Sequence, residues 1–255
     1  MSVTYNFSGK RVLVTGGAKG LGRGVVSKFV SSGASVIALD LDKDALADLK
    51  STHPSVTTIH ADLSDWEKSR EAVLALPTGP IHHLVNNAGI SEVVEFSKIT
   101  PKNVDTIFGI NYKALINMGQ VMAKTLEQGG VTTGGTIVNV SSILDSRVVP
   151  GAALYCSTKA AVTMLTKAMA VELAPLKIRV NAVRPTLMAT DILPLDNEYR
   201  LQVRDGLVNF CMERQLSKRL LTVEETADAI LFLSSDAAEM VNGSDILVDG
   251  GVYTV

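Results

Sequence analysis

The 255-residue chain has only two cysteines, and its N-terminus lacks the features of a secretion signal. Cys156 and Cys211 stand in separate segments, so neither needs a function of its own. Residues 1–17 lack the charged n-region followed by an apolar h-region that a signal peptide has, and the chain has no unbroken apolar run of ~18 residues. These absences favour a cytoplasmic protein with reduced thiols and argue against a membrane span.

The sequence also lacks linkers, internal repeats and blocks of like charge. We therefore expect residues 1–255 to form a single domain. The formal net charge is -2 and the basic residues are scattered, which leaves no footprint for nucleic acid or an anionic membrane. Small neutral or anionic molecules are the expected partners. No metal site is expected, because no ligand spacing links the four histidines, His53, His60, His82 and His83.

Short runs rich in valine and isoleucine alternate with helical patterns along the chain. Such runs are typical of parallel strands covered on both faces. After the first run, Leu21, Val25 and Phe29 recur every four residues and Gly33 follows, which predicts a helix with a left-handed cap and hence a βαβ unit. The expected strands are residues 11–16, 35–40, 56–62, 82–89, 135–142, 178–185 and 246–251.

Capping residues mark several helix starts. Thr100 before Pro101 indicates one start, and residues 64–67 and 222–225 fit the capping-box pattern. The alternation of strands and helices predicts the α/β class, as a doubly wound Rossmann fold with a seven-stranded parallel sheet and helices on both faces. In such folds the ligand site lies beyond the carboxyl ends of the strands. Long helices are expected over residues 101–127 and 152–174.

A glycine-rich turn, TGGAKGLGRG, covers residues 15–24. Gly16, Gly20 and Gly22 lie where the first strand gives way to a helix, and glycine allows unusual φ values and close approach of a ligand. The amide groups and the positive end of the helix are suited to a pyrophosphate. Tight packing alone is the alternative explanation, but the position at the start of a βα series favours phosphate binding.

Two acidic residues end the second and third expected strands. Asp40 stands at the distance from the glycine turn where a carboxylate accepts hydrogen bonds from the ribose of a dinucleotide. Capping of the next helix is the alternative, and Asp42 fits that role better. Asp62 is placed to contact adenine. Capping of the following helix, by Asp62 or by Ser64, is an equal alternative.

The segment GAALYCSTKAAV, residues 151–162, places a tyrosine and a lysine four positions apart. On a helix, Tyr155 and Lys159 would lie side by side on one face. Taken alone, the pair is explained by a tyrosine at the rim of an amphipathic helix and a lysine that reaches water. The other motifs of the chain decide between this explanation and a catalytic one.

Four motifs occur in a fixed order: T-G-x3-G-x-G at residues 15–22, NNAG at 86–89, Ser142 thirteen residues before YCSTK, and VDGG at 248–251. With these motifs the sequence resembles the short-chain dehydrogenase/reductase family, in its compact single-domain division. The resemblance covers essentially the whole chain. Residues 9–24, 62–74 and 155–186 are similar to the dicarbonyl and L-xylulose reductases of that family.

The resemblance implies four catalytic residues, Tyr155, Lys159, Ser142 and Asn111. Tyr155 would exchange a proton with the substrate oxygen while hydride moves to or from a nicotinamide. A phenol with a pKa of ~10 needs a neighbour that favours the phenolate, and Lys159 would supply that charge. Ser142 would hold the reacting oxygen. Asn111 would hold a water on Lys159 through its backbone carbonyl at a helix distortion, although a buried, satisfied amide is its alternative role.

The resemblance also implies a nicotinamide dinucleotide as the cofactor. Lys19 stands where members that use NADP often carry a basic residue, whereas Asp40 stands where members that use NAD carry an acid. A 2′-phosphate beside Asp40 would set like charges together, so NAD is expected and NADP is less favoured. The cofactor-binding residues implied are Gly16, Lys19, Gly20, Leu21, Gly22, Asp40, Asp62, Leu63, Asn87, Ala88, Gly89, Tyr155, Lys159, Pro185, Leu187 and Thr190.

The expected substrate contacts are apolar. Residues 187–220 are expected to form a lid, and the residues expected to contact the substrate are Ile143, Val149, Leu187 and Met188. This favours a secondary alcohol or ketone with apolar surface, oxidised or reduced with NAD(H). An NADPH-dependent reductase of dicarbonyls or L-xylulose is the alternative. A non-catalytic nucleotide-sensing scaffold is a third reading, since fold alone does not fix function.

Self-association is expected from the two long helices. Their apolar residues exceed what one face of a sheet needs to cover, and the family resemblance implies a homotetramer with the apolar tail GVYTV near an interface. The residues behind this expectation are Met118, Met122, Met164, Leu165 and Met169.

Overall fold

A computed structural model describes residues 4–76, 79–130, 134–188 and 198–253. Within these residues one sheet of seven parallel strands runs through the molecule in the order β3-β2-β1-β4-β5-β6-β7. The order reverses between β1 and β4, which is the doubly wound Rossmann arrangement that the sequence predicts. The strands are β1 (Arg11–Thr15), β2 (Ser35–Asp40), β3 (Thr57–His60), β4 (His83–Asn86), β5 (Gly135–Val140), β6 (Ile178–Pro185) and β7 (Asp245–Val248).

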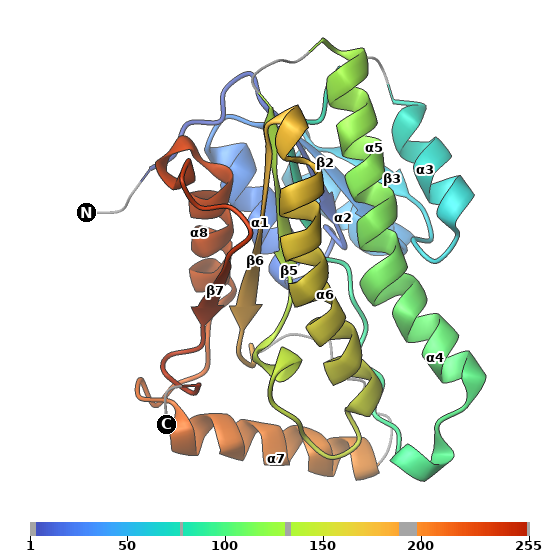
Figure 1. Cartoon of the computed structure of the whole chain (residues 1–255), viewed down its shortest axis with the longest axis vertical. Helices are drawn as coiled ribbons and strands as arrows, with labels where there is room; N and C mark the ends of the chain where they lie inside the picture. The colour runs from blue at the N-terminus through green and yellow to red at the C-terminus, as the bar shows by residue number, and fades with distance from the viewer. Residues whose placement is uncertain (1–3, 77–78, 131–133, 189–197, 254–255) are drawn as a thin grey trace.

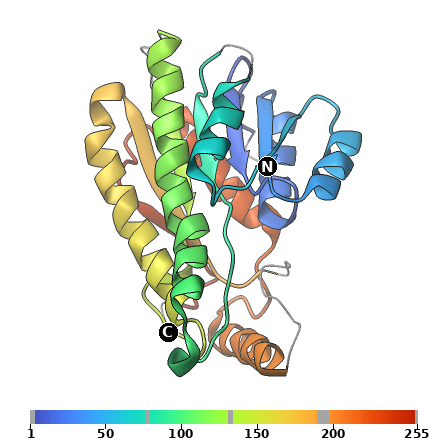
Figure 2. The same ribbon diagram turned by 90° about the vertical axis from the view of Figure 1, so that its right-hand side faces the viewer.

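Helices cover both faces of this sheet (Figure 1). Figure 2 shows α5 and α6 side by side across one of the faces. The α-helices are α1 (Gly20–Ser31), α2 (Lys43–Thr52), α3 (Trp66–Leu74), α4 (Pro101–Phe108), α5 (Ala114–Gln128), α6 (Ala153–Glu172), α7 (Glu198–Arg214) and α8 (Val223–Ser234). A π-helical turn, η2 (Gly109–Lys113), joins α4 to α5, and 3-10 turns occur at η1 (Phe96–Lys98), η3 (Ile143–Asp145), η4 (Ala174–Leu176) and η5 (Asp236–Ala238).

The alternation of side chains along the strands divides the core in two. Val12 and Val14 of β1 belong to the layer packed by α1, α2 and α8, whereas Leu13 belongs to the layer packed by α3, α5 and α6. All three side chains are fully buried. Because both faces are covered, the strands contain nearly continuous apolar runs.

The helix start predicted at Thr100 and Pro101 and the capping box predicted at Thr222 and Glu225 are both confirmed. Thr100 also forms a capping box with Asn103, which the sequence pattern does not predict. The capping box expected at residues 64–67 is wrong. Asp65 caps α3 by accepting a hydrogen bond from the Lys68 amide. Neither Ser64 nor Asp62 caps this helix, because the Ser64 amide and hydroxyl both donate to Asp62 Oδ1.

Several strands are shorter than the sequence suggests. The strands expected over 56–62, 82–89 and 135–142 end at His60, Asn86 and Val140, and the strand expected over 246–251 spans Asp245–Val248. The residues that follow β3, β4 and β5 leave the sheet and line the cavity described below. Asp249 turns the chain after β7 by accepting bonds from the amides of Gly251 and Tyr253.

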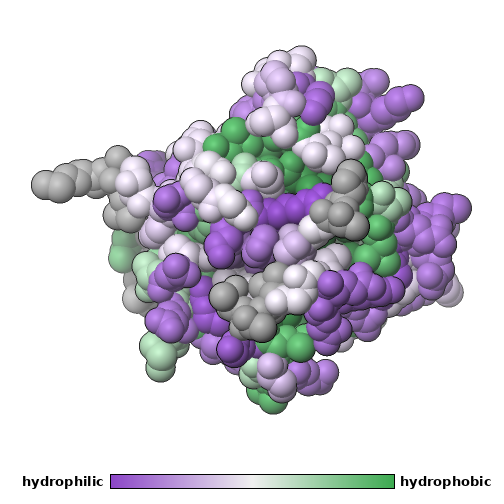
Figure 3. Space-filling model, turned by 90° about the horizontal axis from the view of Figure 1, so that it is seen from above, coloured by the Kyte–Doolittle hydropathy of each residue, from purple (hydrophilic) through white to green (hydrophobic). Residues whose placement is uncertain are grey.

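The carboxyl ends of the strands share the edge of the sheet across which α7 lies (Figure 1). At the opposite end, seen from above in Figure 3, hydrophilic side chains are interspersed with small hydrophobic areas. Among the helices of the described residues, none is long and apolar enough to cross a membrane.

Candidate active site

A cavity of about 370 Å³ opens at the carboxyl edge of the sheet. It lies at the switch in strand order, where doubly wound folds bind ligands. Of the residues that the sequence predicts, it brings together Gly16, Lys19, Gly20, Leu21, Asp40, Asp62, Leu63, Asn87, Ala88, Gly89, Ser142, Ile143, Val149, Tyr155, Lys159, Pro185, Leu187 and Met188. Gly22 and Asn111 are not among the residues that line the cavity, and Thr190 lies outside the described residues.

The glycines of the first turn have separate structural roles. Gly16 and Gly20 have φ values of 61° and 48°, a region that side chains other than glycine rarely adopt. Gly22 is needed for a different reason, because a Cβ there would lie 1.9 Å from the Gly16 carbonyl oxygen. The turn can therefore pass close under a ligand at the start of α1. A pyrophosphate fits this cradle, since the first amides of a helix attract anions.

Asn87, which directly follows β4, holds the same turn in place. Its Nδ2 donates to the carbonyl oxygens of Thr15 and Gly16, at 3.0 Å each. The Thr15 hydroxyl in turn accepts bonds from the Asn87 and Ala88 amides. Asn86 is structural, because its buried side chain bonds Asn139 of β5. The NNAG motif thus fixes the glycine turn to the centre of the sheet.

The carboxylate of Asp40 is held at the end of β2. Its two oxygens accept bonds of 3.0 Å from the amides of Ala18 and Asp42. Asp42 caps α2, as its position in the sequence suggests, and its second oxygen lies 2.5 Å from the Lys19 ammonium. The cap amide and Lys19 lower the pKa of Asp42. Lys19 is therefore paired with the acid that caps α2.

Asn111 lies in the π-helical turn η2, so the helix distortion expected at this residue is present. Its side chain is fully buried and bonds both polar groups of Ile90, accepting from the amide and donating to the carbonyl. It also donates to Thr158 of α6. The amide side chain thus ties the loop after β4 to the helix that carries Tyr155 and Lys159.

The two serines after β5 face different partners. The Ser141 hydroxyl donates to the Lys159 carbonyl and pairs with the Thr163 hydroxyl, so it fastens β5 to α6. Ser142 begins the turn η3, and its oxygen accepts a bond from the Leu144 amide. Ser142 is also close enough to Tyr155 for hydrogen bonding to lower the pKa of the phenol. Of the two, Ser142 is therefore the serine placed to share a substrate oxygen with the tyrosine.

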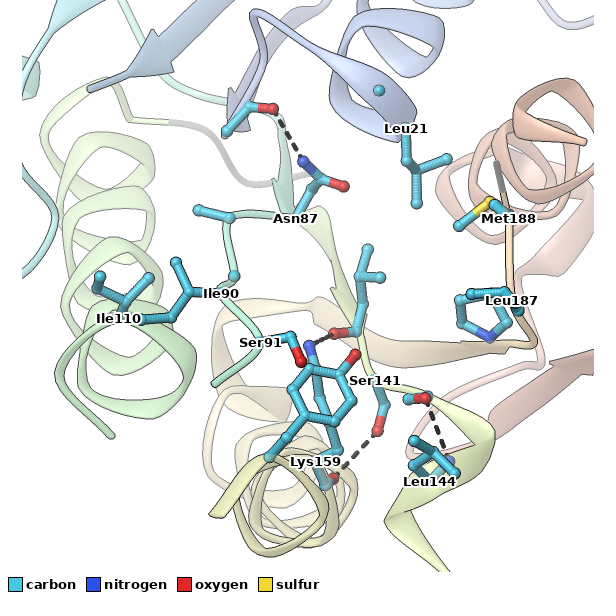
Figure 4. A pocket seen from close by; sticks show the side chains of 18 of the residues that line it. Leu21, Asn87, Ile90, Ser91, Ile110, Ser141, Leu144, Lys159, Leu187 and Met188 are labelled. Carbon is cyan, nitrogen blue, oxygen red and sulfur yellow. Dashed lines mark hydrogen bonds between the residues drawn. The ribbon is translucent and has the colours of Figure 1, made fainter. Parts of the chain in front are cut away.

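Tyr155 and Lys159 lie on one face of α6, as the spacing predicts. The Lys159 ammonium lies 5.5 Å from the centre of the tyrosine ring and donates to the Val140 carbonyl at 2.8 Å. Figure 4 shows Lys159 beside Ser141 in the cavity. Helix α6 thus presents both side chains at the end of β5.

Burial shifts the pKa of each group in the direction that favours its neutral form. It raises the pKa of Tyr155 to about 12, while hydrogen bonding with Ser142 acts in the opposite direction. It lowers the pKa of Lys159, which is 3% exposed, to about 8. Desolvation is the largest cause of the shift at Tyr155, and the expectation that Lys159 favours the phenolate stays a prediction. The tyrosine is a protonated phenol at neutral pH.

The other side of the cavity is apolar. In Figure 4, Ile90 and Ile110 face Leu187 and Met188 across the space. Some of the lining residues that the site prediction missed come from the loop after β4, from η2 and from α7, where only contact in the folded chain identifies them. Ile90, Ser91 and Val93 lie in the loop, Ile110 in η2, and Val203 and Cys211 in α7.

Comparison with known proteins agrees with this geometry. A family model described as enoyl-(acyl carrier protein) reductase matches residues 16–253. Carbonyl reductase [NADPH] 2 of Sus scrofa is 39% identical over 96% of this chain and 97% of its own length. L-xylulose reductase of Mus musculus is also 39% identical, over 96% of each chain.

Two solved structures share the fold. A gluconate 5-dehydrogenase from Burkholderia cenocepacia, in complex with NADP and tartrate, has a TM-score of 0.87 and 26% identity over 98% of this chain and 97% of its own. A 3-ketoacyl-(acyl-carrier-protein) reductase from Brucella melitensis, complexed with NADH, has a TM-score of 0.86 and 31% identity over 97% and 99%. Together with the matches in sequence, they show that the chain belongs to the short-chain dehydrogenase/reductase family of oxidoreductases.

Proposed function

We propose that this enzyme transfers hydride between NAD(H) and a secondary alcohol or ketone that carries apolar surface. One observation supports this most: Ser142, Tyr155 and Lys159 line the same cavity as the glycine turn. A dinucleotide seated on that turn would extend toward the tyrosine. The intact set of polar groups speaks against a non-catalytic scaffold.

The chemistry divides between cofactor and protein. A bound nicotinamide supplies or accepts the hydride at the carbon of the reacting group. In ketone reduction, Ser142 orients the oxygen and the Tyr155 phenol gives it the proton. The raised pKa of Tyr155 keeps that proton in place at neutral pH until it is needed. Lys159 then stabilises the phenolate by its charge, and the Val140 carbonyl holds the ammonium in position.

Asp40 supports the preference for NAD. Its carboxylate is fixed by two backbone amides, so it cannot easily turn away from a 2′-phosphate. Lys19, the basic residue that would favour NADP, is paired with Asp42. Against this stand a relative named for NADPH and a structure with NADP, whereas the other structure holds NADH.

Replacement of Tyr155 by Phe tests the proposed acid. The variant keeps the ring but loses the exchangeable proton, so turnover should fall by roughly 10²- to 10⁴-fold while NADH binding stays nearly intact. Steady-state kinetics and fluorescence titration with NADH measure the two effects. Turnover within a factor of about two of the parent would contradict the assignment.

Cofactor preference is tested by Asp40→Ser combined with Leu41→Arg. The parent should prefer NADH, and the double change should shift the ratio of kcat/KM values toward NADPH by at least tenfold, or about 1.4 kcal/mol. Asp44→Ser is the matched control, because this acid lies in the first turn of α2 and not in the cavity. A parent that already prefers NADPH would favour the dicarbonyl or L-xylulose reductase alternative.

Substrate preference is tested by comparing 4-phenyl-2-butanone, a ketone with one carbonyl group and an apolar surface, with L-xylulose. The apolar lining should favour the phenyl ketone, and Val149→Thr should reduce that preference about threefold to tenfold, since a hydroxyl replaces a methyl against the substrate. Val148→Thr is the control, because Val148 is 83% exposed. A higher kcat/KM for L-xylulose in the parent would sink the proposal.

Self-association remains part of the proposal, with a corrected basis. Met118 and Met122 are fully buried in the core of the protomer, so they offer no exposed apolar surface to a second subunit. Met164 and Val171 lie seven residues apart on α6 and are 65% and 76% exposed. Part of the tail packs inward, since Val252 is fully buried, and residues 254–255 lie outside the described residues.

We expect a homotetramer whose interface covers this face of α6. Light scattering at micromolar concentration should give about four times the protomer mass of 27.1 kDa, and Met164→Glu with Val171→Glu should lower it. A parent mass near that of one protomer would rule out the assembly.

A further inference from the structure

A buried ion pair lies behind the proposed catalytic residues. Arg184, near the end of β6, places Nη2 2.5 Å from Asp145 Oδ1 and Nη1 2.9 Å from Asp245 Oδ1. The side chains of Arg184 and Asp145 are 10% and 3% exposed, whereas Asp245 is 22% exposed. Buried charges at this depth require partners, so the pair constrains the elements that carry it.

Asp145 links this pair to the catalytic helix. Its second oxygen, Oδ2, accepts a bond of 2.7 Å from the Thr163 hydroxyl of α6. The Ser141 hydroxyl lies 2.8 Å from Thr163 and 3.0 Å from the Lys159 carbonyl, and it shares its one hydrogen between these two acceptors. A continuous path of polar contacts thus runs from Arg184 to the backbone of the lysine.

Asp145 also closes the turn that begins at Ser142. Its amide donates to the Ser142 carbonyl at 3.1 Å, and the Leu144 amide donates to the Ser142 hydroxyl oxygen at 3.1 Å. Both the turn with the serine and the helix with Tyr155 are therefore attached to one residue. In Figure 4 the bonds at Leu144 and at Lys159 are both drawn.

The C-terminal segment braces the same turn from outside. The guanidinium groups of Arg147 and Arg184 lie 4.9 and 5.0 Å from the centre of the Tyr253 ring. Arg147 also donates to the Tyr253 carbonyl. Inside the turn, Ile143 and Leu144 pack in a cluster with Val252.

We propose that Asp145, compensated by Arg184, is a positioning residue that fixes Ser142 relative to Tyr155. The proposal rests on the function assigned above to these two residues. It predicts that Asp145 governs the chemical step, although it does not line the cavity. The Asp245 arm of Arg184 is not linked to α6 by these contacts, and it provides the comparison.

The test compares Asp145→Asn and Thr163→Val with Asp245→Asn. With 4-phenyl-2-butanone and NADH, the first two should lower kcat roughly tenfold to a hundredfold, with NADH binding within a factor of about two. Asp245→Asn should stay within about threefold of the parent, and Thr163→Ser should restore most of the loss. Thr163→Val keeps the side-chain shape, so it tests the link even if Asp145→Asn folds poorly.

Hydrogen exchange tests the same link without turnover. Amides of residues 142–147 and of α6 near Thr163 should exchange faster together in Asp145→Asn and in Thr163→Val, but not in Asp245→Asn. Equal kinetics in all three variants, or unchanged exchange in these segments, would overturn the proposal. A parent that turns over no ketone would instead refute the assigned function, and exchange would then decide the positioning claim.

Discussion

All seven strands run parallel, so each delivers its last residues to the same edge of the sheet. The order of strands reverses between β1 and β4, and the loops after these strands diverge to opposite faces and leave a cavity between them. The glycine turn, Asp40 and Ser142 reach one site only because of this constraint. Helices pack on both faces of the sheet and fix its carboxyl edge, so the packing of the core determines the geometry of the site.

Within this frame, short polar contacts place the reacting groups. The Lys159 ammonium is bound by the Val140 carbonyl, Asn111 joins the loop after β4 to α6, and Asp145 joins the turn after β5 to the same helix. These contacts are buried or partly buried, where an unmade hydrogen bond is costly. Desolvation also sets the pKa values of Tyr155 and Lys159, which favours a phenol that holds its proton.

The sequence predicts the sheet, the long helices and most of the cavity lining, because valine-rich runs, capping residues and glycine spacing are local signals. It misses features that depend on contacts between distant segments. The sequence predicts Ser64 as the cap of α3, but Asp65 is the cap in the structure because Ser64 bonds Asp62 instead. Val93 and Cys211 line the cavity because the loop after β4 and helix α7 fold against it, and no local sequence pattern predicts that contact. Met118 and Met122 look like interface residues in sequence but fill the core.

The central claim is that hydride and proton reach one substrate at Tyr155. The most direct measurement is the mass spectrum of the product formed from a ketone and NADH that carries two deuterium atoms at C4 of the nicotinamide. The account predicts one deuterium at the carbinol carbon in each product molecule formed by the parent enzyme. Oxidation of NADH without deuterium in the product would contradict it.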